Sequence, residues 1–426
     1  MKRKAAFKTM GCRLNQYETD ALVTDFYKAG YQIVPFADQA DVYVVNTCTV
    51  TSASDHKSKN IINQAVKRNK DSVVVVTGCM ANSRKEWLED REEITFVVEN
   101  KRKSSVFSLV DAHFRGEMLN PGDLKQNLFG FSLVEKGFHT RSMIKIQEGC
   151  NNFCTYCIVP WVRGLAASRP VKDILHHIRQ VTDAGFKEVV LTGVNISRYH
   201  DEGIYFEDLI EKILQLEGNF RLRISSLEPE GFGDKLHDLF SHPKMCPHLH
   251  LCLQSGSDRI LIQMGRQYDL KQYYSIVNRF RKCFPDFNFT TDIITGFPGE
   301  TDEDFDQTCQ VVRDIGFSHI HTFKYSVRKG TKAAGMSGQI PENIKSRRSE
   351  IIRKIGETNK TRYRKTLIGK EQTVLIEKVQ KGIAKGYGEH YVPVEFKARS
   401  DKNTFHRVKI ACLSDGKDPI LIGVKD

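Results

Sequence analysis

Short apolar segments alternate with amphipathic segments through about the first 340 residues of this chain. Residues 42–45 and 72–76 are almost continuously apolar, and a polar segment with helical periodicity follows the first of them. Strands that are apolar along their whole length are buried on both faces, as in parallel sheets covered by helices. The alternation therefore predicts an α/β fold built on parallel strands.

The first predicted domain spans residues 1–117 and is a small doubly wound parallel sheet. Its expected strands are residues 5–10, 42–45 and 72–76, and its expected helices are residues 15–29 and 54–69. A loose segment that contains Asn120-Pro-Gly-Asp123 follows this domain. Because Pro and Gly interrupt regular structure there, we interpret residues 118–138 as a linker.

The second predicted domain spans residues 139–366 and repeats a strand followed by a helix. Its expected strands are residues 143–147, 188–192, 221–225, 248–253, 287–294 and 319–324, and helical patterns include residues 171–184 and 301–315. Six consecutive units of this kind favour a curved, partial (β/α)6 barrel over a flat sheet. A basic helix over residues 342–366 is expected to close the domain.

The third predicted domain spans residues 367–426, where the periodicity changes to short alternating runs separated by glycines. Its expected strands are residues 372–376, 391–396, 407–413 and 420–424. This pattern predicts a small antiparallel β-barrel, an architecture that is common among nucleic-acid-binding modules.

The positive charge of the chain is concentrated near its end. The formal net charge is +12, and residues 341–426 contain 20 Lys and Arg against 11 Asp and Glu, a difference of +9. Such a region suits RNA, because phosphate contacts give affinity without sequence readout. A solvated helix and barrel surface would account for the charge equally well. The basic residues of the expected helix that could line a tRNA path are Arg347, Arg348, Arg353, Lys354, Arg362 and Arg364.

The sequence indicates neither a membrane protein nor a secreted one. No segment reaches the roughly 18 consecutive apolar residues that a membrane span needs. The basic N-terminus lacks the apolar core and cleavage site of a signal peptide. The 11 cysteines are an odd number, which argues against a disulfide framework. We therefore expect a cytoplasmic protein whose grouped cysteines bind metal or carry redox chemistry.

Three cysteines lie close together directly after the first expected strand of the central domain. The sequence Cys150-Asn-Asn-Phe-Cys154-Thr-Tyr-Cys157 has the spacing C-x3-C-x2-C. Three thiolates on one loop can hold three irons of a [4Fe–4S] cluster and leave the fourth free to chelate S-adenosylmethionine. One electron passed to the sulfonium would break a carbon–sulfur bond and give a 5′-deoxyadenosyl radical. A zinc site or buried core cysteines would fit this polar loop less well.

A second set of cysteines is dispersed in sequence but shares one structural position. Cys12, Cys48 and Cys79 each follow an expected strand of the first domain. Because the carboxyl ends of parallel strands open at the same edge of a sheet, these thiols can converge on one site. Gly11 and Gly78 would let the backbone approach a bulky cluster. A second three-cysteine iron–sulfur cluster explains this placement, and three unrelated buried cysteines are the alternative.

Several motifs of the chain are shared with one family of enzymes. They are Gly11-Cys-Arg-Leu-Asn-Gln-Tyr-Glu-Thr19, Val45-Asn-Thr-Cys-Thr-Val50, Gly149-Cys-Asn-Asn-Phe-Cys-Thr-Tyr-Cys157, Arg163-Gly164, Ser168-Arg-Pro170, Ser225-Ser-Leu-Glu-Pro229, Leu251-Cys-Leu-Gln-Ser-Gly-Ser257 and Thr291-Asp-Ile-Ile-Thr-Gly-Phe-Pro-Gly-Glu300. With these motifs the chain resembles the radical S-adenosylmethionine methylthiotransferases over nearly its full length. The last domain is similar to the RNA-binding TRAM domain.

The resemblance implies an enzyme that installs a methylthio group on an unactivated C–H bond. One S-adenosylmethionine would be the methyl donor and another the radical source. The form Gly-Cys-x-x-Asn-Gln-Tyr-Glu resembles the subgroup that acts on N6-threonylcarbamoyladenosine at position 37 of tRNA, next to the anticodon. N6-isopentenyladenosine and a ribosomal-protein aspartate, the targets of its relatives, stay open as alternatives. An RNA-associated iron–sulfur redox sensor is an alternative of another class.

The resemblance also implies cofactors and partners. The expected cofactors are two [4Fe–4S] clusters and S-adenosylmethionine, and the expected partner is the anticodon stem-loop of tRNA. The radical step needs an external electron donor such as flavodoxin or ferredoxin, and the sulfur donor is left open. Radical chemistry suits this target, because adenine C2 carries a strong, non-acidic C–H bond that no side-chain base could deprotonate.

Four further residues are candidates for contacts with S-adenosylmethionine. Tyr156 lies inside the cysteine loop, where the superfamily prefers an aromatic residue near the adenine. Asn195 and Glu228 each follow an expected barrel strand and could bind the methionine end and the ribose, but they could equally be helix caps or turn residues. Gly296 belongs to a turn that could let the adenine lie close to the backbone. His250 and Cys252 are expected to be packing or hydrogen-bonding residues rather than ligands.

Overall fold

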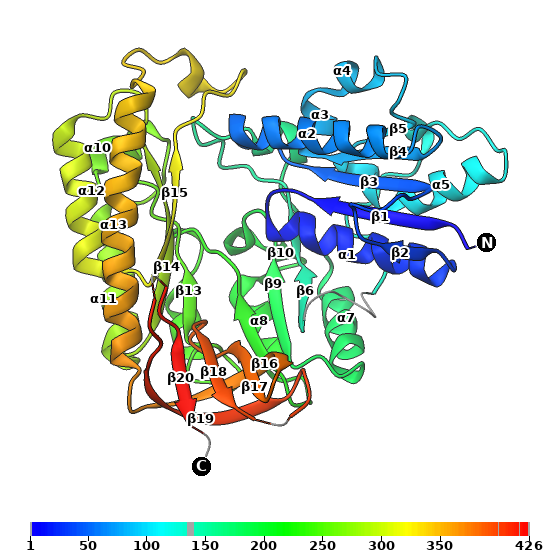
Figure 1. Ribbon diagram of the computed structural model, residues 1–426. Coiled ribbons are helices and arrows are strands. Elements are labelled where there is room, and N and C mark those ends of the chain that lie inside the picture. The colour runs from blue at the N-terminus through cyan, green and yellow to red at the C-terminus, as the bar shows by residue number, and fades with distance from the viewer. Residues whose placement is uncertain (1, 134–139, 399, 417, 425–426) are drawn as a thin grey trace.

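The N-terminal part of the chain folds into a doubly wound parallel sheet, as its apolar segments predict. A computed structural model describes residues 2–133, 140–398, 400–416 and 418–424. The five strands of this sheet run in the order β2–β1–β3–β4–β5, and all their pairings are parallel. They are β1 (Lys4–Thr9), β2 (Gln32–Val34), β3 (Val42–Thr47), β4 (Val73–Gly78) and β5 (Phe96–Val98). Helices cover both faces of the sheet (Figure 1).

The two faces of this sheet have separate hydrophobic cores. Helices α1 (Arg13–Lys28) and α5 (Val106–Phe114) pack on one face, where Phe26 and Val110 are buried. Helices α2 (Ser52–Arg68), α3 (Cys79–Ser83) and α4 (Lys85–Glu89) pack on the other, where Ile62 and Met80 are buried. Every residue of β3 and β4 is buried, which explains their continuous apolar sequence.

The described part of the segment that follows the first domain packs against that domain. Residues 121–123 form a single 3-10 turn. Phe131 is buried, and its ring packs edge-on against Tyr17 of α1 at 5.7 Å between centroids. Residues 134–138 of the expected linker lie outside the described residues. The part of the linker that is described is therefore tied to the first domain by a buried aromatic contact.

The central part of the chain contains six parallel strands in sequence order. They are β6 (Arg141–Lys145), β9 (Glu188–Thr192), β12 (Arg221–Ile224), β13 (His248–His250), β14 (Asn288–Thr295) and β15 (His319–Lys324). They form two three-stranded sheets, which single parallel bridges at Leu222–Met245 and Leu227–Leu251 join. Successive parallel strands are therefore joined in order, and among the described residues β6 and β15 do not pair with each other. This arrangement is the expected open, partial barrel.

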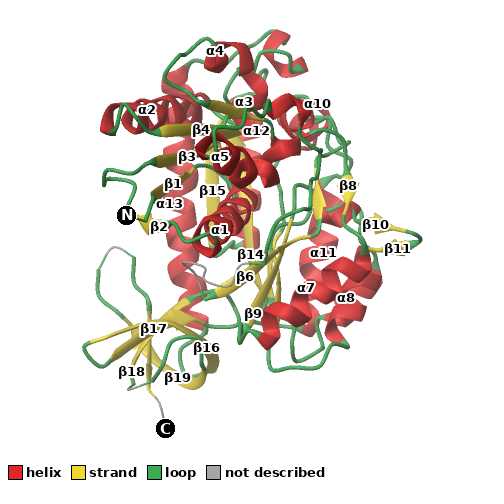
Figure 2. Ribbon diagram, turned by 90° about the vertical axis from the view of Figure 1, so that its right-hand side faces the viewer, coloured by secondary structure: helices red, strands yellow, loops and turns green. Residues whose placement is uncertain are grey.

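The helices of this region lie outside the partial barrel. They are α7 (Val171–Asp183), α8 (Phe206–Leu214), α9 (Asp234–Leu239), α10 (Asp258–Gln263), α11 (Leu270–Cys283) and α12 (Asp302–Ile315). Figure 2 shows α7 and α8 side by side along the strands. The short helix α6 (Val159–Arg163) and the strand pairs β7 (Gln147–Glu148) with β8 (Ala167–Ser168) and β10 (His200–Asp201) with β11 (Ile204–Tyr205) belong to the loops.

Helix α13 (Glu342–Thr366) closes the central region as predicted and packs along β15. Its basic residues are divided between two environments. Arg348 and Arg364 are buried and pair with Glu300 and Asp418, whereas Arg347, Arg353, Lys354 and Arg362 are exposed. The buried pairs show that part of the charge of this helix holds the fold together.

The C-terminal part is a closed five-stranded barrel with the order β16–β17–β18–β20–β19. Its strands are β16 (Glu371–Gln380), β17 (Ile383–Tyr387), β18 (Pro393–Lys397), β19 (Phe405–Leu413) and β20 (Leu421–Val424). The pairing of β18 with β20 is parallel, in contrast to the antiparallel barrel expected, and the other pairings are antiparallel. Gly386 is required in β17, because a Cβ there would lie 1.9 Å from the Leu375 carbonyl oxygen.

The C-terminal barrel lies against the beginnings of the central strands (Figure 1). Arg221, the first residue of β12, donates to the carbonyl oxygens of Thr373 and Tyr387 at 2.8 and 2.9 Å. Asn288, the first residue of β14, donates to the carbonyl oxygen of His390 at 2.6 Å. The first domain contacts the carboxyl end of β6, where Lys145 pairs with Glu18 of α1. Among the described residues, no helix is long and apolar enough to cross a membrane.

Candidate active site

The loop of Cys150, Cys154 and Cys157 follows β6 and β7 at the carboxyl end of the central strands. It folds back on itself, since Cys157 donates its backbone N–H to the carbonyl oxygen of Cys154 at 2.9 Å. Gly149 has a φ of +68°, and a Cβ there would lie 2.0 Å from the Leu165 carbonyl oxygen, so only glycine fits. Burial is the main cause that raises the pKa of Cys154 and the pKa of Cys157, the latter to about 12. The neighbouring thiols raise both values further. Cys154 and Cys157 therefore favour the protonated thiol until a metal replaces their protons.

Polar side chains from two other strand ends and from the segment after α10 lie beside this loop. The Asn195 side-chain N–H lies 3.9 Å from the Cys150 Sγ, and Arg266 donates to the Cys154 Sγ at 3.3 Å. Arg266 also forms an ion pair with Glu228. Asn195 and Glu228, which the sequence singles out, thus both lie beside the cysteine loop. Arg266 was missed, because it belongs to no recognisable motif and reaches the loop from 112 residues away.

A cavity of about 220 Å³ lies beside Cys157. Tyr156 lines it, and the Tyr156 ring packs edge-on against Phe297 at 6.4 Å. Asp292 and Ile294 of β14 form another wall, and Val50 and Thr51 of the first domain line the cavity as well. The cavity therefore lies between the cysteine loop and the first domain.

Gly296 forms part of the turn that follows β14 and has a φ of +71°. Its backbone N–H donates to the Glu300 carboxylate at 2.8 Å, and a Cβ would lie 2.4 Å from the Lys345 side chain. Both the conformation and the close packing require glycine here. Gly296 thus shapes the wall to which Ile294 belongs, with its own N–H already bonded.

Cys12, Cys48 and Cys79 also come together, at the carboxyl edge of the N-terminal sheet. Cys12 is the N-cap of α1, Cys48 follows β3, and Cys79 begins α3. A Cβ on Gly11 would lie 2.9 Å from the Cys48 Sγ, which shows how closely the first loop approaches the second. Gly78, with a φ of +95°, is packed against the Thr47 backbone. Burial, with the neighbouring thiols adding to it, raises the pKa of both Cys48 and Cys79.

One side chain joins the two groups of cysteines. The Asn100 amide lies 3.9 Å from the Cys79 Sγ and donates to the carbonyl oxygen of Val162 at 2.8 Å. Val162 belongs to α6, which begins two residues after Cys157. The two cysteine groups therefore share a short, buried connection, which the sequence did not indicate.

A buried network of charges holds the first domain against the central strands. Glu18 of α1 accepts from Lys103 at 2.5 Å and from Lys145 at 2.9 Å, and Arg163 bonds to both Glu18 and Glu148. All five side chains are at most 3% exposed. Burial alone would raise the pKa of Glu18, but the surrounding cations hold it well below its usual value. Three cations therefore share two carboxylates at this interface.

Replacing Glu18 with Gln should lower the free energy of unfolding by about 3 kcal/mol, because it leaves buried cations without their shared carboxylate. Urea titration at neutral pH would measure the change. The stabilisation by Glu18 is present above the ordinary carboxyl pKa and is lost as the pH falls through the lowered value of the folded state. The two proteins should therefore converge in strong acid. Glu89→Gln, at a half-exposed pair with Lys85, is the matched control and should change little.

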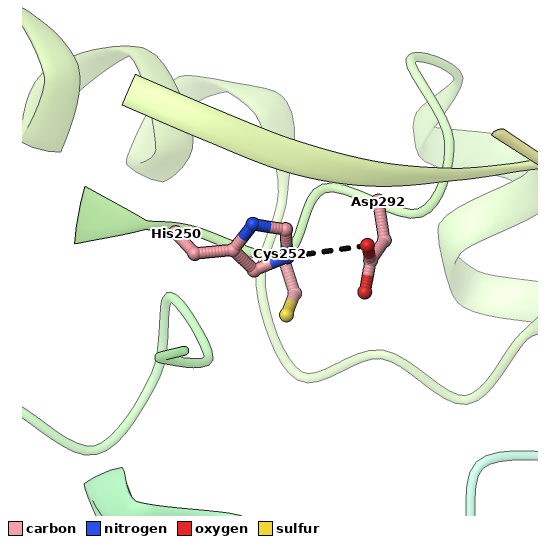
Figure 3. Close-up of side chains that lie close together, drawn as sticks. All are labelled: His250, Cys252 and Asp292. Carbon is pink, nitrogen blue, oxygen red and sulfur yellow. Dashed lines mark ion pairs between the residues drawn. The ribbon is translucent and has the colours of Figure 1, made fainter. Parts of the chain in front are cut away.

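A third polar group lies inside the barrel and consists of His250, Cys252 and Asp292 (Figure 3). The Nε2 of His250 lies 3.2 Å from an Asp292 carboxylate oxygen, and its Nδ1 lies 3.0 Å from the Thr290 hydroxyl. Burial, and then the Asp292 charge, raise the pKa of the Cys252 thiol well above its usual value. With both imidazole nitrogens occupied and the thiol protonated, hydrogen bonding accounts for this group better than metal ligation.

The two cysteine groups suit iron–sulfur clusters by the chemistry of their donors. Each offers three thiols from loops that contain glycine, and among the described residues neither set has its three sulfurs within 4.8 Å of one another, as ligands of a single ion would be. The thiols whose pKa burial raises, such as Cys48 and Cys154, become thiolates when they bind a metal cation. The residues present therefore fit two three-cysteine clusters.

Comparison with known proteins covers nearly the whole chain. The profile of the Radical SAM superfamily matches residues 144–312, and that of Uncharacterized protein family UPF0004 matches residues 4–99. Threonylcarbamoyladenosine tRNA methylthiotransferase MtaB of Thermotoga maritima is 36% identical over 414 residues, which cover 96% of this chain and 94% of that protein. The Bacillus subtilis protein of the same name is 35% identical and covers 93% and 91%.

A relative with another printed substrate is somewhat less similar. The tRNA-2-methylthio-N(6)-dimethylallyladenosine synthase of Syntrophus aciditrophicus is 34% identical and covers 90% of this chain and 86% of that protein. Among solved structures, the radical S-adenosylmethionine methyltransferase TsrM of Kitasatospora setae has a TM-score of 0.55 at 14% identity. It covers 78% of this chain and 74% of that chain. This last likeness shows a shared fold.

Proposed function

Because the chain belongs to the methylthiotransferase family of radical S-adenosylmethionine enzymes, we propose that it modifies N6-threonylcarbamoyladenosine in tRNA. The reaction converts this nucleoside at position 37, next to the anticodon, to its 2-methylthio derivative. The observation that carries the assignment is identity of 36% over 96% of the chain to a threonylcarbamoyladenosine tRNA methylthiotransferase. We expect the reaction to take place in the cytoplasm, because its substrate is tRNA.

Enzymes of this family use S-adenosylmethionine and iron–sulfur chemistry, and we propose two [4Fe–4S] clusters here. Cys150, Cys154 and Cys157 would hold the first, which when bound supplies the electron that cleaves S-adenosylmethionine to a 5′-deoxyadenosyl radical. Cys12, Cys48 and Cys79 would hold the auxiliary cluster. The grouping of each set at one sheet edge supports this division. Arg266 stabilises the negative thiolate of Cys154 through its bond at 3.3 Å.

We assign four residues to the binding of S-adenosylmethionine. Asn195 and Glu228 lie beside the loop of Cys150, where they can orient the methionine end and the ribose hydroxyls. Tyr156 lines the cavity of about 220 Å³, and Gly296 shapes its wall.

The three domains have separate tasks in this proposal. Residues 1–117 carry the auxiliary cluster, residues 118–138 are the linker, residues 139–366 form the radical domain, and residues 367–426 bind RNA. The exposed basic residues of the C-terminal barrel support the last assignment. They are Lys378, Lys381, Lys385, Lys397, Arg407 and Lys409. An external donor such as flavodoxin or ferredoxin would reduce the radical cluster.

Nucleoside mass spectrometry tests the substrate. Reduced, reconstituted enzyme would receive S-adenosylmethionine, sulfide and tRNA that carries either threonylcarbamoyladenosine or isopentenyladenosine. We expect a methylthio adduct, heavier than the parent nucleoside by one sulfur and one CH2 group, on the first tRNA alone. An adduct on the second alone would keep the chemistry and overturn the substrate. With neither, the protein aspartate would be tested next.

A further inference from the structure

A second cavity, of about 290 Å³, lies where all three parts of the chain meet. Cys12 and Arg13 line it from the first domain, Arg141 and Arg223 from strands β6 and β12, and Tyr391 from the C-terminal barrel. We call it the arginine cavity. It is separate from the cavity beside Cys157, with which it shares no lining residue. Cys12 in its wall connects it to the second group of cysteines.

Arg141 and Arg223 have carboxylate partners outside the cavity. Arg223 donates to Glu188 at 2.8 Å, and Arg141 donates to Glu377 at 2.5 Å. Arg13, in contrast, donates to the Tyr391 hydroxyl at 3.1 Å, and among the described residues no carboxylate forms an ion pair with it. Arg13 is therefore the cation at this cavity that can accept an anionic ligand without losing an existing partner.

The surroundings of Tyr391 show that the cavity favours negative charge. The guanidinium of Arg223 lies 4.6 Å from the centre of the Tyr391 ring, and those of Arg141 and Arg13 lie 5.3 and 5.4 Å from it. Burial alone would raise the pKa of Tyr391, but the three arginines lower it below its ordinary value. An environment that stabilises a phenolate also stabilises a carboxylate.

The start of α1 adds to this positive potential. Cys12 is the N-cap of this 16-residue helix, and no acidic residue lies in its first turn. The positive end of the helix dipole therefore lies beside Arg13 without a compensating charge from the helix itself. Met143 and Val190 also line the cavity, so part of its wall is apolar. The cavity thus combines a cationic end with an apolar wall.

We propose that the arginine cavity binds the carboxylate of the threonyl group of the substrate nucleoside, with Arg13 and the Tyr391 hydroxyl as the main ligands. This inference rests on the proposed function and identifies the residues that select its substrate. The guanidinium plane can bind a carboxylate with two parallel hydrogen bonds. The isopentenyl group offers no anion, so it would leave Arg13 desolvated and without an anionic partner.

The position of the cavity agrees with the chemistry. The threonylcarbamoyl group is attached at N6 of the adenine, and sulfur is inserted at C2 of the same ring. Arg13 and Cys12 line the same cavity, so a group held by Arg13 would lie near the auxiliary cysteines. Binding of the carboxylate would therefore fix the base beside the second group of cysteines rather than elsewhere in the barrel.

The test compares anticodon stem-loops that differ at one group. The first carries threonylcarbamoyladenosine, the second carries its threoninamide analogue, in which a neutral carboxamide replaces the carboxylate, and the third carries unmodified adenosine. Their affinities for the reconstituted full-length enzyme would be measured, together with methylthio product. We expect wild-type enzyme to bind the first about 10- to 100-fold more tightly than the second, as for the loss of a charge-assisted contact. Arg13→Gln should bring this ratio close to one.

Two further variants separate recognition from folding. Tyr391→Phe removes one hydroxyl and should reduce the ratio in the same direction, by about threefold to tenfold. Arg115→Gln, at an exposed arginine that pairs with Asp111 and Glu117, is the control and should keep the wild-type ratio. Because each ratio is taken within one protein preparation, partial unfolding would lower both affinities and leave the ratio unchanged.

Several results would overturn the assignment. An Arg13→Gln enzyme that keeps the full ratio would show that Arg13 does not bind the carboxylate. An Arg13→Gln enzyme that binds all three stem-loops more weakly by the same factor would mean that Arg13 binds a backbone phosphate. Wild-type enzyme that forms the methylthio product but binds the first two stem-loops equally would refute the cavity and leave the proposed function intact. Absence of that product, with an adduct on isopentenyladenosine, would refute the proposed function itself.

Discussion

Cys154→Ala should abolish the formation of 5′-deoxyadenosine from S-adenosylmethionine. Cys154 is buried in the loop of Cys150 and Cys157, and Arg266 donates to its sulfur. Loss of partners outside the coordination shell of a metal costs 10- to 100-fold in activity, so loss of a direct thiolate ligand should cost more than about 100-fold. Chromatography of the nucleosides released by chemically reduced enzyme would measure the effect.

The chain offers a matched control for this substitution. Cys412 is an exposed cysteine of the C-terminal barrel, and Cys412→Ala should leave the rate unchanged. Wild-type rates in Cys154→Ala would refute the assignment of the radical cluster. If reduced wild-type protein gave no 5′-deoxyadenosine at all, the alternative of a redox sensor would replace the enzyme.

Cys48→Ala should separate the two chemistries of the enzyme. Cys48 lies at the edge of the N-terminal sheet, with Cys12 and Cys79, so its loss should disturb the auxiliary cluster alone. We expect 5′-deoxyadenosine to form still, while the methylthio nucleoside falls by more than about 100-fold. Quantifying both products in the same reaction gives the result directly.

The iron content provides an independent check on this division. Wild-type enzyme should bind about eight irons per chain and Cys48→Ala about four. Cys309→Ala, at a buried cysteine of α12, is the control for loss of a buried thiol and should bind the wild-type amount. Equal loss of cleavage in Cys48→Ala and Cys154→Ala would contradict two clusters with separate tasks.

The fold could be predicted where burial leaves a long periodic signal. The valine-rich strands β3 and β4 and the six strands of the partial barrel were found for this reason. Strands β2 and β5 were missed because each has three residues and lies at the edge of the sheet, too short for a period of two to be seen. Strand β17 was missed because Gly386, needed for close packing against β16, resembles a turn residue.

The candidate site could be predicted in part, because strand ends of a parallel sheet meet at one edge. That rule predicts from the sequence that Cys12, Cys48 and Cys79 lie close together. It gives no information on side chains that arrive from distant segments. Arg266 reaches the cysteine loop from a distant segment of the same domain, whereas Asn100 and the residues of the arginine cavity depend on contacts between domains. No local pattern encodes either kind of contact. The roles of the predicted ligands stay predictions until the substitutions are made.

The hydrogen bonds from Arg221 and Asn288 to barrel carbonyls have a consequence for evolution. Tyr391 belongs to the same barrel. The C-terminal barrel, which we propose binds RNA, therefore also supplies part of the wall of the arginine cavity. A barrel transplanted from a relative would bring a different wall with it. Exchange of this module between lineages should therefore alter which nucleoside is modified, and RNA binding and substrate choice should be inherited together.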